Sequence, residues 1–343
     1  MPMARMRALL SRFAGGPDSL SLGEVEIPVP GPGEVRIAVK ACGINFPDTL
    51  VIEDRYQFKP DRPFAPGGEV AGIVDAVGPG VTRFRKGDRV IGSGINGGLA
   101  EYTVLEEFRC FILPEPLPLE EGAGLLMTYG TSHHALKDRA KLAAGEKLLV
   151  LGAAGGVGLA AVELGKARGA FVIGAVSSEE KAQVVRDKGA DAVIVYPRDL
   201  DKDGARAFTD RIRAEAGGPI DVVYDPVGGP YAEPSLRALG WDGRHLVVGF
   251  PAGIPRIPLN LPLLKSCSIV GVFWGAFIEN FPESNRANVE ELIEYWRQGL
   301  VRPLISARFP LERGGEAIAQ LGSRAAIGKI VVLVDAPDTG VPA

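Results

Sequence analysis

Apolar positions follow two different rhythms along this chain, and the first rhythm is typical of strands. Val35, Ile37 and Val39 alternate with more polar neighbours, which places apolar side chains on one face of a half-buried strand. Glycine and proline gather between such segments, as in the run Pro30–Gly33. Residues 5 to about 125 are therefore predicted to form a small all-β domain, a partly closed barrel.

A second rhythm begins near residue 127, where short apolar runs alternate with stretches of helical spacing. The runs are 148–151, 171–176, 192–195, 221–225, 246–250 and 268–274. Repeated strand–helix units predict an α/β Rossmann architecture, a doubly wound parallel sheet with helices on both faces. A helix over 288–298 and a strand over 329–334 are expected after the last run.

The stretch from Lys147 to Ala170 combines a strand, a glycine-rich turn and a helix. Its apolar run leads into a turn over 152–158, and apolar positions at helical spacing follow. Glycines let the backbone turn sharply and approach a ligand closely, and a helix start offers unpaired N–H groups to a pyrophosphate. We expect a dinucleotide to bind here. The candidate contacts are Gly152, Ala154, Gly155, Gly156, Val157 and Gly158.

The end of the second apolar run, 171–176, bears on which dinucleotide binds. An acidic residue usually stands there and holds a ribose 2′-hydroxyl, but in this chain the position is apolar. Ser177, Ser178 and Lys181 stand just beyond it, and a hydroxyl with an ammonium suits a 2′-phosphate. The pattern favours NADPH over NADH. The alternative is a helix-capping Ser178 beside a solvated Lys181.

Composition narrows the class of protein. The chain has 343 residues, which favours two domains, and 46% apolar residues, which are enough for a packed core. A net charge of −4 without a basic patch argues against nucleic acid as a partner. Because no apolar run approaches about 18 residues, we expect no membrane span. Cys42, Cys110 and Cys267 show no paired spacing, so we expect reduced thiols in a cytoplasmic protein.

Several motifs recur in an order typical of one protein family. They are ACGINFPD (41–48), PFAPGGEVAGIVDAVG (63–78), GDRVIG (87–92), GLAEYTVL (98–105), GAAGGVG (152–158), GADAVIVY (189–196) and SRAAIGKIVVL (323–333). On these residues the chain resembles the medium-chain dehydrogenase/reductase superfamily, and within it the zinc-free NADPH:quinone oxidoreductase branch.

The resemblance implies a division of the chain and an assembly. A GroES-like catalytic domain would cover 1–125, and an NADPH-binding Rossmann domain would cover 126–275. Residues 276–343 would return to the first domain, complete its barrel and end in a tail. In relatives the last strand of the Rossmann sheet, here 269–274, pairs with a second copy, so we expect a homodimer.

Alcohol dehydrogenases of this superfamily hold a catalytic zinc with two cysteines and a histidine. The resemblance places those positions at Asn45, at Gly68 and at or near Met127. Asparagine, glycine and methionine do not make a tight zinc site, which needs thiolate, imidazole or carboxylate donors. The chain's histidines have no ligand spacing either; they are His133, His134 and His245. We therefore expect no metal.

Without a metal, the expected chemistry is hydride transfer from NADPH to an electron-poor acceptor such as a quinone. Asn45 is the first catalytic candidate, because its amide could bridge cofactor and substrate oxygen; a turn-forming asparagine before Pro47 is the alternative. Tyr56 could donate a hydrogen bond or a proton to the developing oxyanion, or pack on its own domain. Asp48 could hold water or a ribose hydroxyl, or cap a short helix. For Glu69, which remains from the metal motif, we expect a salt bridge or an orienting role.

The resemblance implies further cofactor contacts. Tyr196 would lie against the adenine or its phosphate, Arg324 would reach the 2′-phosphate, and Thr131 would touch the nicotinamide or its ribose. Phe250 and Phe273, near the ends of the last two apolar runs, complete the set. Two other functions stay open at this stage. One is an enoyl-thioester or 2-alkenal reductase on the same fold, and the other is an NADPH-binding protein with little turnover.

Overall fold

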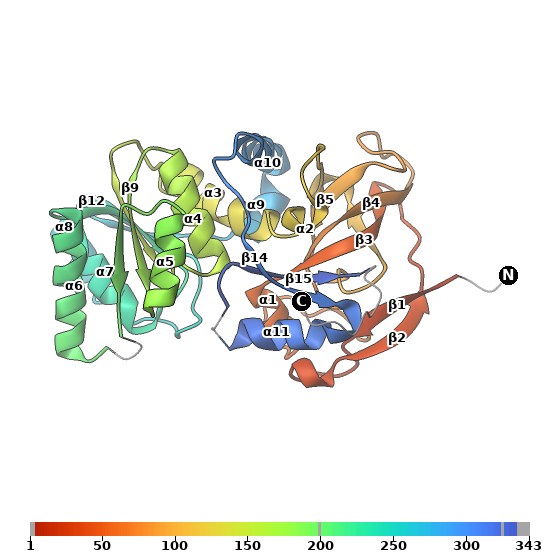
Figure 1. The fold of residues 1–343 in the computed structure, drawn as a ribbon, viewed down its shortest axis with the longest axis horizontal. Coiled ribbons are helices and arrows are strands. Elements are labelled where there is room, and N and C mark those ends of the chain that lie inside the picture. Colours follow the sequence, from red (N-terminus) through yellow and green to blue (C-terminus); the bar gives the residue numbers. More distant parts are fainter. Residues whose placement is uncertain (1–3, 198–199, 324–325, 335–343) are drawn as a thin grey trace. The chain divides into compact units, whose positions relative to one another are not determined.

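The structure, a computed structural model, describes residues 4–197, 200–323 and 326–334. The chain divides into two compact units. The first combines the described residues up to Met127 with those from Arg302 onward, so both ends of the chain build one unit. The second unit holds Thr128–Val301. In Figure 1 the first unit therefore carries the colours of both ends of the sequence, red and blue. None of the described helices is long and apolar enough to cross a membrane.

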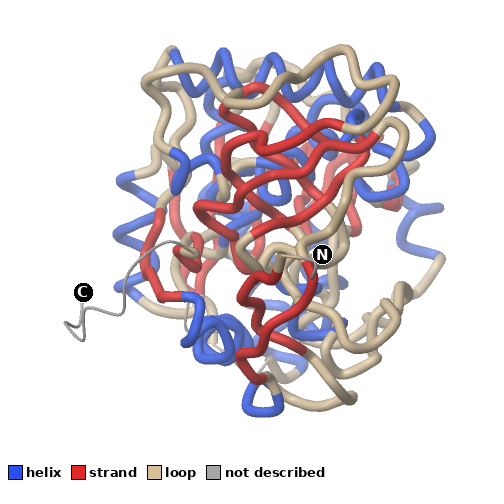
Figure 2. The backbone as a smooth tube through the Cα atoms, turned by 90° about the vertical axis from the view of Figure 1, so that its right-hand side faces the viewer, coloured by secondary structure: helices blue, strands red, loops and turns tan. Residues whose placement is uncertain are grey.

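The first unit is built on a mostly antiparallel sheet, and Figure 2 shows its strands facing the viewer in red. Among the described residues the strand order is β14-β15-β3-β4-β5-β7, with β6 paired to β3, while β1 and β2 form a separate pair. The strands are β1 (Arg5–Leu10), β2 (Ser21–Glu26), β3 (Glu34–Ile44), β4 (Glu69–Val77), β5 (Arg89–Ser93), β6 (Tyr102–Glu106), β7 (Cys110–Ile112), β14 (Ile305–Pro310) and β15 (Lys329–Leu333). The predicted alternation in β3 is confirmed, because Val35, Ile37 and Val39 are buried and their neighbours are half-buried.

The late strand β15 completes this sheet. It pairs antiparallel with β3, where Ile330 lies opposite Ile44, and parallel with β14. Ile330 and Val332 join Ile37 in one buried apolar core. The helices of this unit are η1 (Pro17–Ser19), α1 (Phe46–Val51), η2 (Glu107–Arg109), α2 (Leu119–Gly122), η6 (Leu311–Arg313) and α11 (Gly314–Gly322).

The second unit contains a parallel sheet with the order β10-β9-β8-β11-β12-β13 among the described residues. Its strands are β8 (Lys147–Leu151), β9 (Phe171–Val176), β10 (Ala192–Val195), β11 (Ile220–Asp225), β12 (Leu239–Val247) and β13 (Ser268–Gly271). The chain starts at the centre with β8, adds β9 and β10 on one side, and then crosses to add the other three. This doubly wound order confirms the predicted architecture. It creates a switch point between the carboxyl ends of β8 and β11, where such sheets bind dinucleotides.

Helices cover this sheet on both faces. As a result, four consecutive residues of β8, Leu148–Leu151, have no exposed surface. The helices are η3 (Leu126–Gly130), which spans the boundary between the units, and α3 (Thr131–His133), η4 (His134–Arg139), α4 (Gly156–Ala167), α5 (Glu179–Asp187), α6 (Lys202–Ala216), η5 (Gly229–Tyr231), α7 (Ala232–Ala238), α8 (Asn260–Lys265), α9 (Trp274–Asn280) and α10 (Pro282–Arg297).

Several element boundaries differ from the prediction, each for a local reason. Strand β12 begins seven residues before the apolar run at 246 that predicted it, since its first half carries the exposed Trp241 and so lacks a continuous apolar run. The strand predicted over 268–274 ends at Gly271, where the chain turns into α9. Helix α10, predicted from 288, begins at Pro282, and proline suits a first helical position.

The second unit also extends beyond 275, the boundary predicted from the sequence, to Val301. Helix α10 belongs to this unit because its buried face contacts earlier helical residues. Asn288 Nδ2 donates a hydrogen bond to Asp138 Oδ2 at 2.8 Å. An amphipathic pattern shows that a helix exists, but it does not show which domain the helix contacts.

Candidate functional site

The glycine-rich turn after β8 is too tightly folded for larger residues at two positions. Gly152 has a left-handed backbone, with φ at +58°, which strains any residue that has a side chain. A Cβ at Gly158 would lie 2.3 Å from the carbonyl oxygen of Gly152, so the following helix packs against the turn without room for a methyl group. Gly155 is different, because the nearest atom to an added Cβ is Gly152 O at 3.5 Å. The side of the turn at Gly155 is therefore open to a ligand.

Helix α4 starts from this turn with Gly155 as its N-cap residue. The first N–H groups of a helix have no intrahelical acceptor, and the helix dipole makes this end positive. A pyrophosphate fits such an end, where Gly156 and Val157 supply N–H groups. Ser132 Oγ donates to Val157 O at 2.9 Å and so braces the first turn of the helix. Ala154 is 2% exposed, so its side chain packs inward while the turn presents backbone.

The loop after β9 carries the residues predicted to select NADPH. Ser178 is the N-cap residue of α5, and its Oγ accepts a hydrogen bond from Lys181 N at 3.4 Å. The capping alternative is therefore observed. A hydroxyl that accepts this bond keeps its own hydrogen to donate, so capping and phosphate binding are compatible. Ser177, Ser178 and Lys181 are all half-buried at this strand end.

Tyr196 lies within the core of the second unit and not on an open surface. It is 7% exposed, and its ring centroid lies 4.6 Å from that of Tyr231 and 5.6 Å from that of Phe208. Burial raises the pKa of its hydroxyl, against the opposing effect of the nearby Gly152 backbone. This packing does not offer the ring to an adenine. Tyr196 supports the glycine-rich turn from inside the core.

Two of the remaining predicted contacts are aromatic side chains at the carboxyl edge of the sheet. Phe250 follows β12 and is 42% exposed, and Phe273 follows β13 and is 47% exposed. Partly exposed aromatic side chains at this edge are suited to contact with a planar ring of the cofactor. Thr131 begins α3 and is half-buried. Arg324 lies outside the described residues.

The sequence analysis missed the loop after β11. Its glycines Gly228 and Gly229 both have left-handed backbones, with φ at +68° and +56°. The side chain of Val227 packs on the glycine-rich turn, because a Cβ at Gly152 would lie 2.8 Å from Val227 Cγ2. This loop therefore borders the turn at the switch point of the sheet. The sequence feature that could have identified this loop is the glycine pair shortly after the apolar run 221–225.

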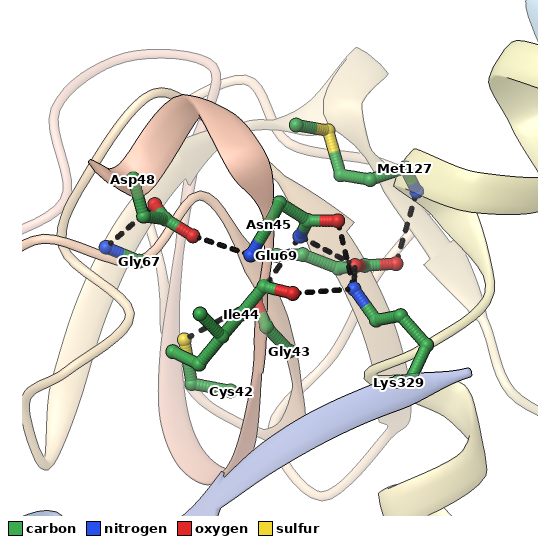
Figure 3. A network of polar contacts seen from close by, with 9 residues as sticks. All are labelled: Cys42, Gly43, Ile44, Asn45, Asp48, Gly67, Glu69, Met127 and Lys329. Carbon is green, nitrogen blue, oxygen red and sulfur yellow. Dashed lines mark hydrogen bonds and ion pairs between the residues drawn. The ribbon is translucent and has the colours of Figure 1, made fainter. Parts of the chain in front are cut away.

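The first unit holds a buried polar network where three neighbouring strands meet (Figure 3). Asn45 follows β3, Glu69 begins β4 and Lys329 begins β15, and β3 pairs with both of the other strands. Lys329 Nζ donates to Asn45 Oδ1 at 2.7 Å and to Glu69 Oε2 at 2.9 Å. Its third hydrogen bond goes to Ile44 O at 3.0 Å. All three hydrogens of the ammonium group thus have acceptors.

The sequence analysis also missed Lys329, which is 3% exposed. Lysines are almost never fully buried unless they are paired, so a lysine at the start of an apolar strand is normally taken as solvated. The only sequence feature that indicated a buried lysine was the carboxylate of the metal motif, which remains in this chain without a metal and needs a positively charged partner. The salt bridge expected for that residue, Glu69, is confirmed, and Lys329 is its partner.

Asn45 is 8% exposed, and its amide is committed within the network. Its Nδ2 donates to Gly43 O at 3.1 Å and to Glu69 Oε2 at 2.9 Å. Both amide hydrogens are used, so in this arrangement Asn45 has none to donate to a substrate oxygen. The position predicted as catalytic holds together the ends of three strands.

Asp48 is 2% exposed and lies one helical turn from Asn45. Its Oδ2 accepts from Asn45 N at 2.7 Å and its Oδ1 from Gly67 N at 3.2 Å. Of the alternatives considered for Asp48, helix capping is the one observed. Burial raises the pKa of Asp48 to about 6, against the opposing effect of the hydrogen bonds from these backbone groups.

Tyr56 lies in the segment between α1 and β4, half-buried, with its ring centroid 6.0 Å from that of Phe58. Its hydroxyl makes no hydrogen bond to any residue that the structure describes. Burial raises the pKa of Tyr56, and the negative charge of Asp48 raises it further. The hydroxyl is therefore protonated at neutral pH and keeps its hydrogen to donate.

The residues at the positions of the zinc ligands do not fit a metal ion. Gly68 has no room for a side chain, because a Cβ there would lie 2.7 Å from Gly94 O. Met127 contributes its backbone N, which donates to Glu69 Oε1 at 2.9 Å. At the third position Asn45 is bound to the ammonium of Lys329. Across the ranges 4–197, 200–323 and 326–334, no group of three His, Cys, Asp or Glu side chains could hold a metal.

Known proteins resemble both parts of the chain. The family model of the alcohol dehydrogenase GroES-like domain matches residues 31–115. The family model of the zinc-binding dehydrogenase matches residues 156–290. The quinone oxidoreductase-like protein 2 homolog of Nematostella vectensis is 41% identical over 88% of this chain and 82% of its own length.

Two solved structures match nearly the whole chain. A mycobacterial protein complexed with NADPH has 31% sequence identity and a TM-score of 0.88, over 96% of this chain and 100% of its own. The quinone oxidoreductase of Escherichia coli complexed with NADPH has 29% identity and a TM-score of 0.86, over the same shares of the two chains, 96% and 100%.

Proposed function

The chain belongs to the medium-chain dehydrogenase/reductase superfamily, in its quinone oxidoreductase branch, and on this basis we propose that it is an NADPH-dependent oxidoreductase that reduces quinones without zinc. When bound, NADPH supplies the hydride. The open-sided turn at Gly155 and the start of α4 suit its pyrophosphate, and Ser177, Ser178 and Lys181 suit its 2′-phosphate.

The observation that carries the zinc-free part of the proposal is the position of the Lys329 ammonium. It lies 2.7 Å from Asn45 Oδ1 and neutralises Glu69, where related alcohol dehydrogenases have metal ligands. A zinc ion there would face a fixed positive charge, and Gly68 leaves no space for an imidazole. A lysine with three acceptors thus supplies the positive charge that the carboxylate needs.

Without a metal site, the proposed reaction requires hydride acceptors that are already activated. Because Asn45, Gly68 and Met127 do not suit a metal ion, they cannot hold a Lewis acid that would polarise an unactivated carbonyl. In a quinone the conjugated carbonyls accept a hydride readily, and the developing oxyanion needs a hydrogen-bond donor. Tyr56 is our candidate for that donor, because its hydroxyl stays protonated and makes no hydrogen bond within the described part of the chain.

We also propose that the protein is a homodimer. Strand β13 is an edge of the parallel sheet, and its outer residues Ser268, Ile269 and Gly271 are exposed. An edge strand presents unpaired N–H and C=O groups that a second copy can bind. Light scattering coupled to gel filtration should give twice the chain mass of 36.2 kDa, and Ile269→Pro, which removes a strand N–H, should reduce it.

A screen of NADPH oxidation tests the function. Purified protein is mixed with NADPH and, separately, with quinones, 2-alkenals and enoyl-CoA thioesters, each with and without a zinc chelator. We expect loss of NADPH absorbance with quinones and no effect of the chelator. Turnover of 2-alkenals or thioesters without quinones would replace our proposal with the conjugated-alkene reductase. NADPH binding without turnover of any acceptor would favour a binding protein, and inhibition that zinc reverses would overturn the metal-free site.

A further inference from the structure

A further buried acid, Asp225, lies in the second unit at the carboxyl end of β11 and is 3% exposed. Its Oδ1 accepts hydrogen bonds from Val227 N at 2.9 Å and from Gly228 N at 2.7 Å. Its backbone oxygen accepts from Val248 N, in the loop after β12, at 2.9 Å. Asp225 therefore anchors the loop after β11 to the end of that strand. It also binds the first residue of the loop after β12.

His245, on β12, is the other partner of this acid and is also 3% exposed. Its Nε2 lies 3.2 Å from Asp225 Oδ2. The parallel register places Asp225 opposite Val247, and side chains alternate along a strand, so His245 and Asp225 share one face of the sheet. An ionised carboxylate can only accept, so Nε2 carries the hydrogen of this bond. The other ring nitrogen, Nδ1, is buried and has no hydrogen-bond partner among the described residues.

The loop after β11, which Asp225 anchors, is hydrogen-bonded to the loop after β12, which carries Phe250. Val227 O accepts from Ala252 N at 2.9 Å. A Cβ at Gly228 would lie 3.0 Å from Phe250 Cδ1, so the two loops are in close contact. A change in the carboxylate of Asp225 would therefore move both loops.

These loops border the part of the site that the glycine-rich turn leaves open. In a doubly wound sheet each half binds one mononucleotide half of the ligand. Strands β8 and β9 carry the glycine-rich turn and the residues proposed for the 2′-phosphate, so their half serves the adenosine side. The loops after β11 and β12, with Val227 and Phe250, then serve the nicotinamide side.

We propose that Asp225 and His245 form a positioning pair for the nicotinamide side of the cofactor, an inference that rests on the proposed NADPH-dependent reaction. His245 Nε2–H fixes the carboxylate, and the carboxylate fixes the two loops. Neither side chain touches the reacting atoms. The arrangement leaves the buried Nδ1 of His245 without a partner among the described residues, so only one of the two ring nitrogens serves the carboxylate.

Two substitutions of His245 separate positioning from packing. His245→Gln keeps a donor near the place of Nε2, whereas His245→Leu removes it. The matched control is Asp221→Ala, near the amino end of β11, the strand that ends at Asp225, where Asp221 Oδ2 accepts from Lys147 N at 2.7 Å. NADPH affinity is measured by nucleotide fluorescence, KM and kcat by quinone reduction, and Tm by thermal unfolding.

We expect His245→Leu to raise the Kd and KM for NADPH by about tenfold, the scale of one hydrogen bond to a charged group. His245→Gln should restore both close to the wild-type values, and Asp221→Ala should lower Tm without changing either. Equal effects of the leucine and glutamine variants would overturn the proposal. So would an Asp221→Ala variant whose NADPH affinity falls in step with its Tm, because the effect would then be general destabilisation.

The binding measurement keeps this proposal separable from the proposed function. A wild-type protein that binds NADPH but reduces no acceptor refutes the reductase, while the three variants still report on the pair through Kd. A protein that turns over quinones with an unchanged Kd and KM in His245→Leu refutes the pair and leaves the reductase standing. A wild-type protein that binds no NADPH refutes both.

Discussion

The Nζ atom of Lys329 lies 2.9 Å from Oε2 of Glu69, and the two side chains are 4% and 0% exposed. Removing two charges from water is costly, and the cost is offset when hydrogen bonds satisfy the remaining donors and acceptors. Glu69 also accepts from Asn45 Nδ2 at 2.9 Å and from Met127 N at 2.9 Å. The two charges therefore depend on each other, and removal of one leaves the other buried without a counter-ion.

Lys329→Met should lower the free energy of unfolding by about 3–5 kcal/mol, because it leaves the carboxylate of Glu69 buried and unpaired. Urea denaturation at pH 7 measures this change. The double variant Lys329→Met/Glu69→Gln should recover a large part of the loss, since no charge stays buried. As a control, Arg5→Met breaks the exposed pair with Glu24 and should change stability by less than about 1 kcal/mol. A loss of that small size in Lys329→Met would contradict the role of the buried pair.

Asp48 should make stability depend on pH, because burial raises its pKa from 3.8 to about 6. A raised pKa in the folded protein means that the native state binds the proton more tightly than the unfolded chain does. The resulting stabilisation is complete below about pH 4 and is lost as pH rises through 6. Asp48→Asn removes this titration. Relative to wild type, the unfolding free energy of the variant should therefore rise by up to about 3 kcal/mol between pH 4 and pH 8.

Urea denaturation of both proteins at the two pH values checks this prediction. Asp54→Asn provides a control, since Asp54 is a half-buried residue of the same segment that pairs with Arg62. A difference between wild type and Asp48→Asn that stays constant from pH 4 to pH 8 would show that Asp48 does not titrate in this range.

The parallel sheet could be predicted because a strand covered on both faces reads as a continuous apolar run, as Leu148–Leu151 does. The same rule failed for the first half of β12, where Trp241 is 77% exposed. The place of α10 in the second unit depends on contacts such as Asn288 with Asp138, which no local pattern contains. Periodicity thus predicts elements and their order, while tertiary contacts decide their ends and their partners.

The glycine-rich turn could be found in the sequence because strand, turn and helix are consecutive. The network around Glu69 could not, since Lys329 stands 260 residues later in the chain. Only the pairing of β15 with β3 brings that lysine to the carboxylate. For the same reason the Asn45 amide was predicted to bridge cofactor and substrate oxygen, although both its amide hydrogens are used within the network.

Tyr56→Phe tests the proposed hydrogen-bond donor. Loss of a general acid typically lowers the rate by about 100-fold or more, so we expect such a fall in kcat for quinone reduction, with a smaller change in the KM for NADPH. Steady-state kinetics with saturating NADPH measure both. The control Phe58→Leu removes the ring that contacts Tyr56 but leaves its hydroxyl. If kcat in Tyr56→Phe matched that of the control, the hydroxyl would have no part in the reaction.

Gly158→Ala should lower stability and Gly155→Ala should weaken NADPH binding, because the two glycines have different surroundings. At Gly158 an added Cβ would lie 2.3 Å from Gly152 O and 2.8 Å from Ala153 Cα, and backbone atoms cannot easily move aside. We expect Gly158→Ala to lower the free energy of unfolding by about 1–3 kcal/mol, as overpacking does. At Gly155 the backbone is extended (φ −75°) and its side is open, so the methyl group should weaken NADPH binding with little change in stability.

Denaturation and nucleotide fluorescence on the same two preparations distinguish these effects. Equal losses of stability in the two alanine variants would show that the turn is uniformly packed and that Gly155 is not a ligand-facing position. Unchanged NADPH affinity in Gly155→Ala would place the pyrophosphate elsewhere.

Lys181→Ala should weaken NADPH binding by about 1–3 kcal/mol, the scale of a charge-assisted hydrogen bond, and leave NADH binding nearly unchanged. The reason is that the 2′-phosphate, which distinguishes the two cofactors, is the group that an ammonium at the end of β9 would bind. Glu180→Ala is the matched control, since Glu180 is the exposed neighbour on the same helix and carries the opposite charge. Its removal should leave NADPH affinity equal or slightly higher. Fluorescence titrations of the wild type and both variants with NADPH and NADH measure the dissociation constants. Equal affinity of the wild-type protein for NADPH and NADH would mean that Ser178 caps its helix without selecting the cofactor.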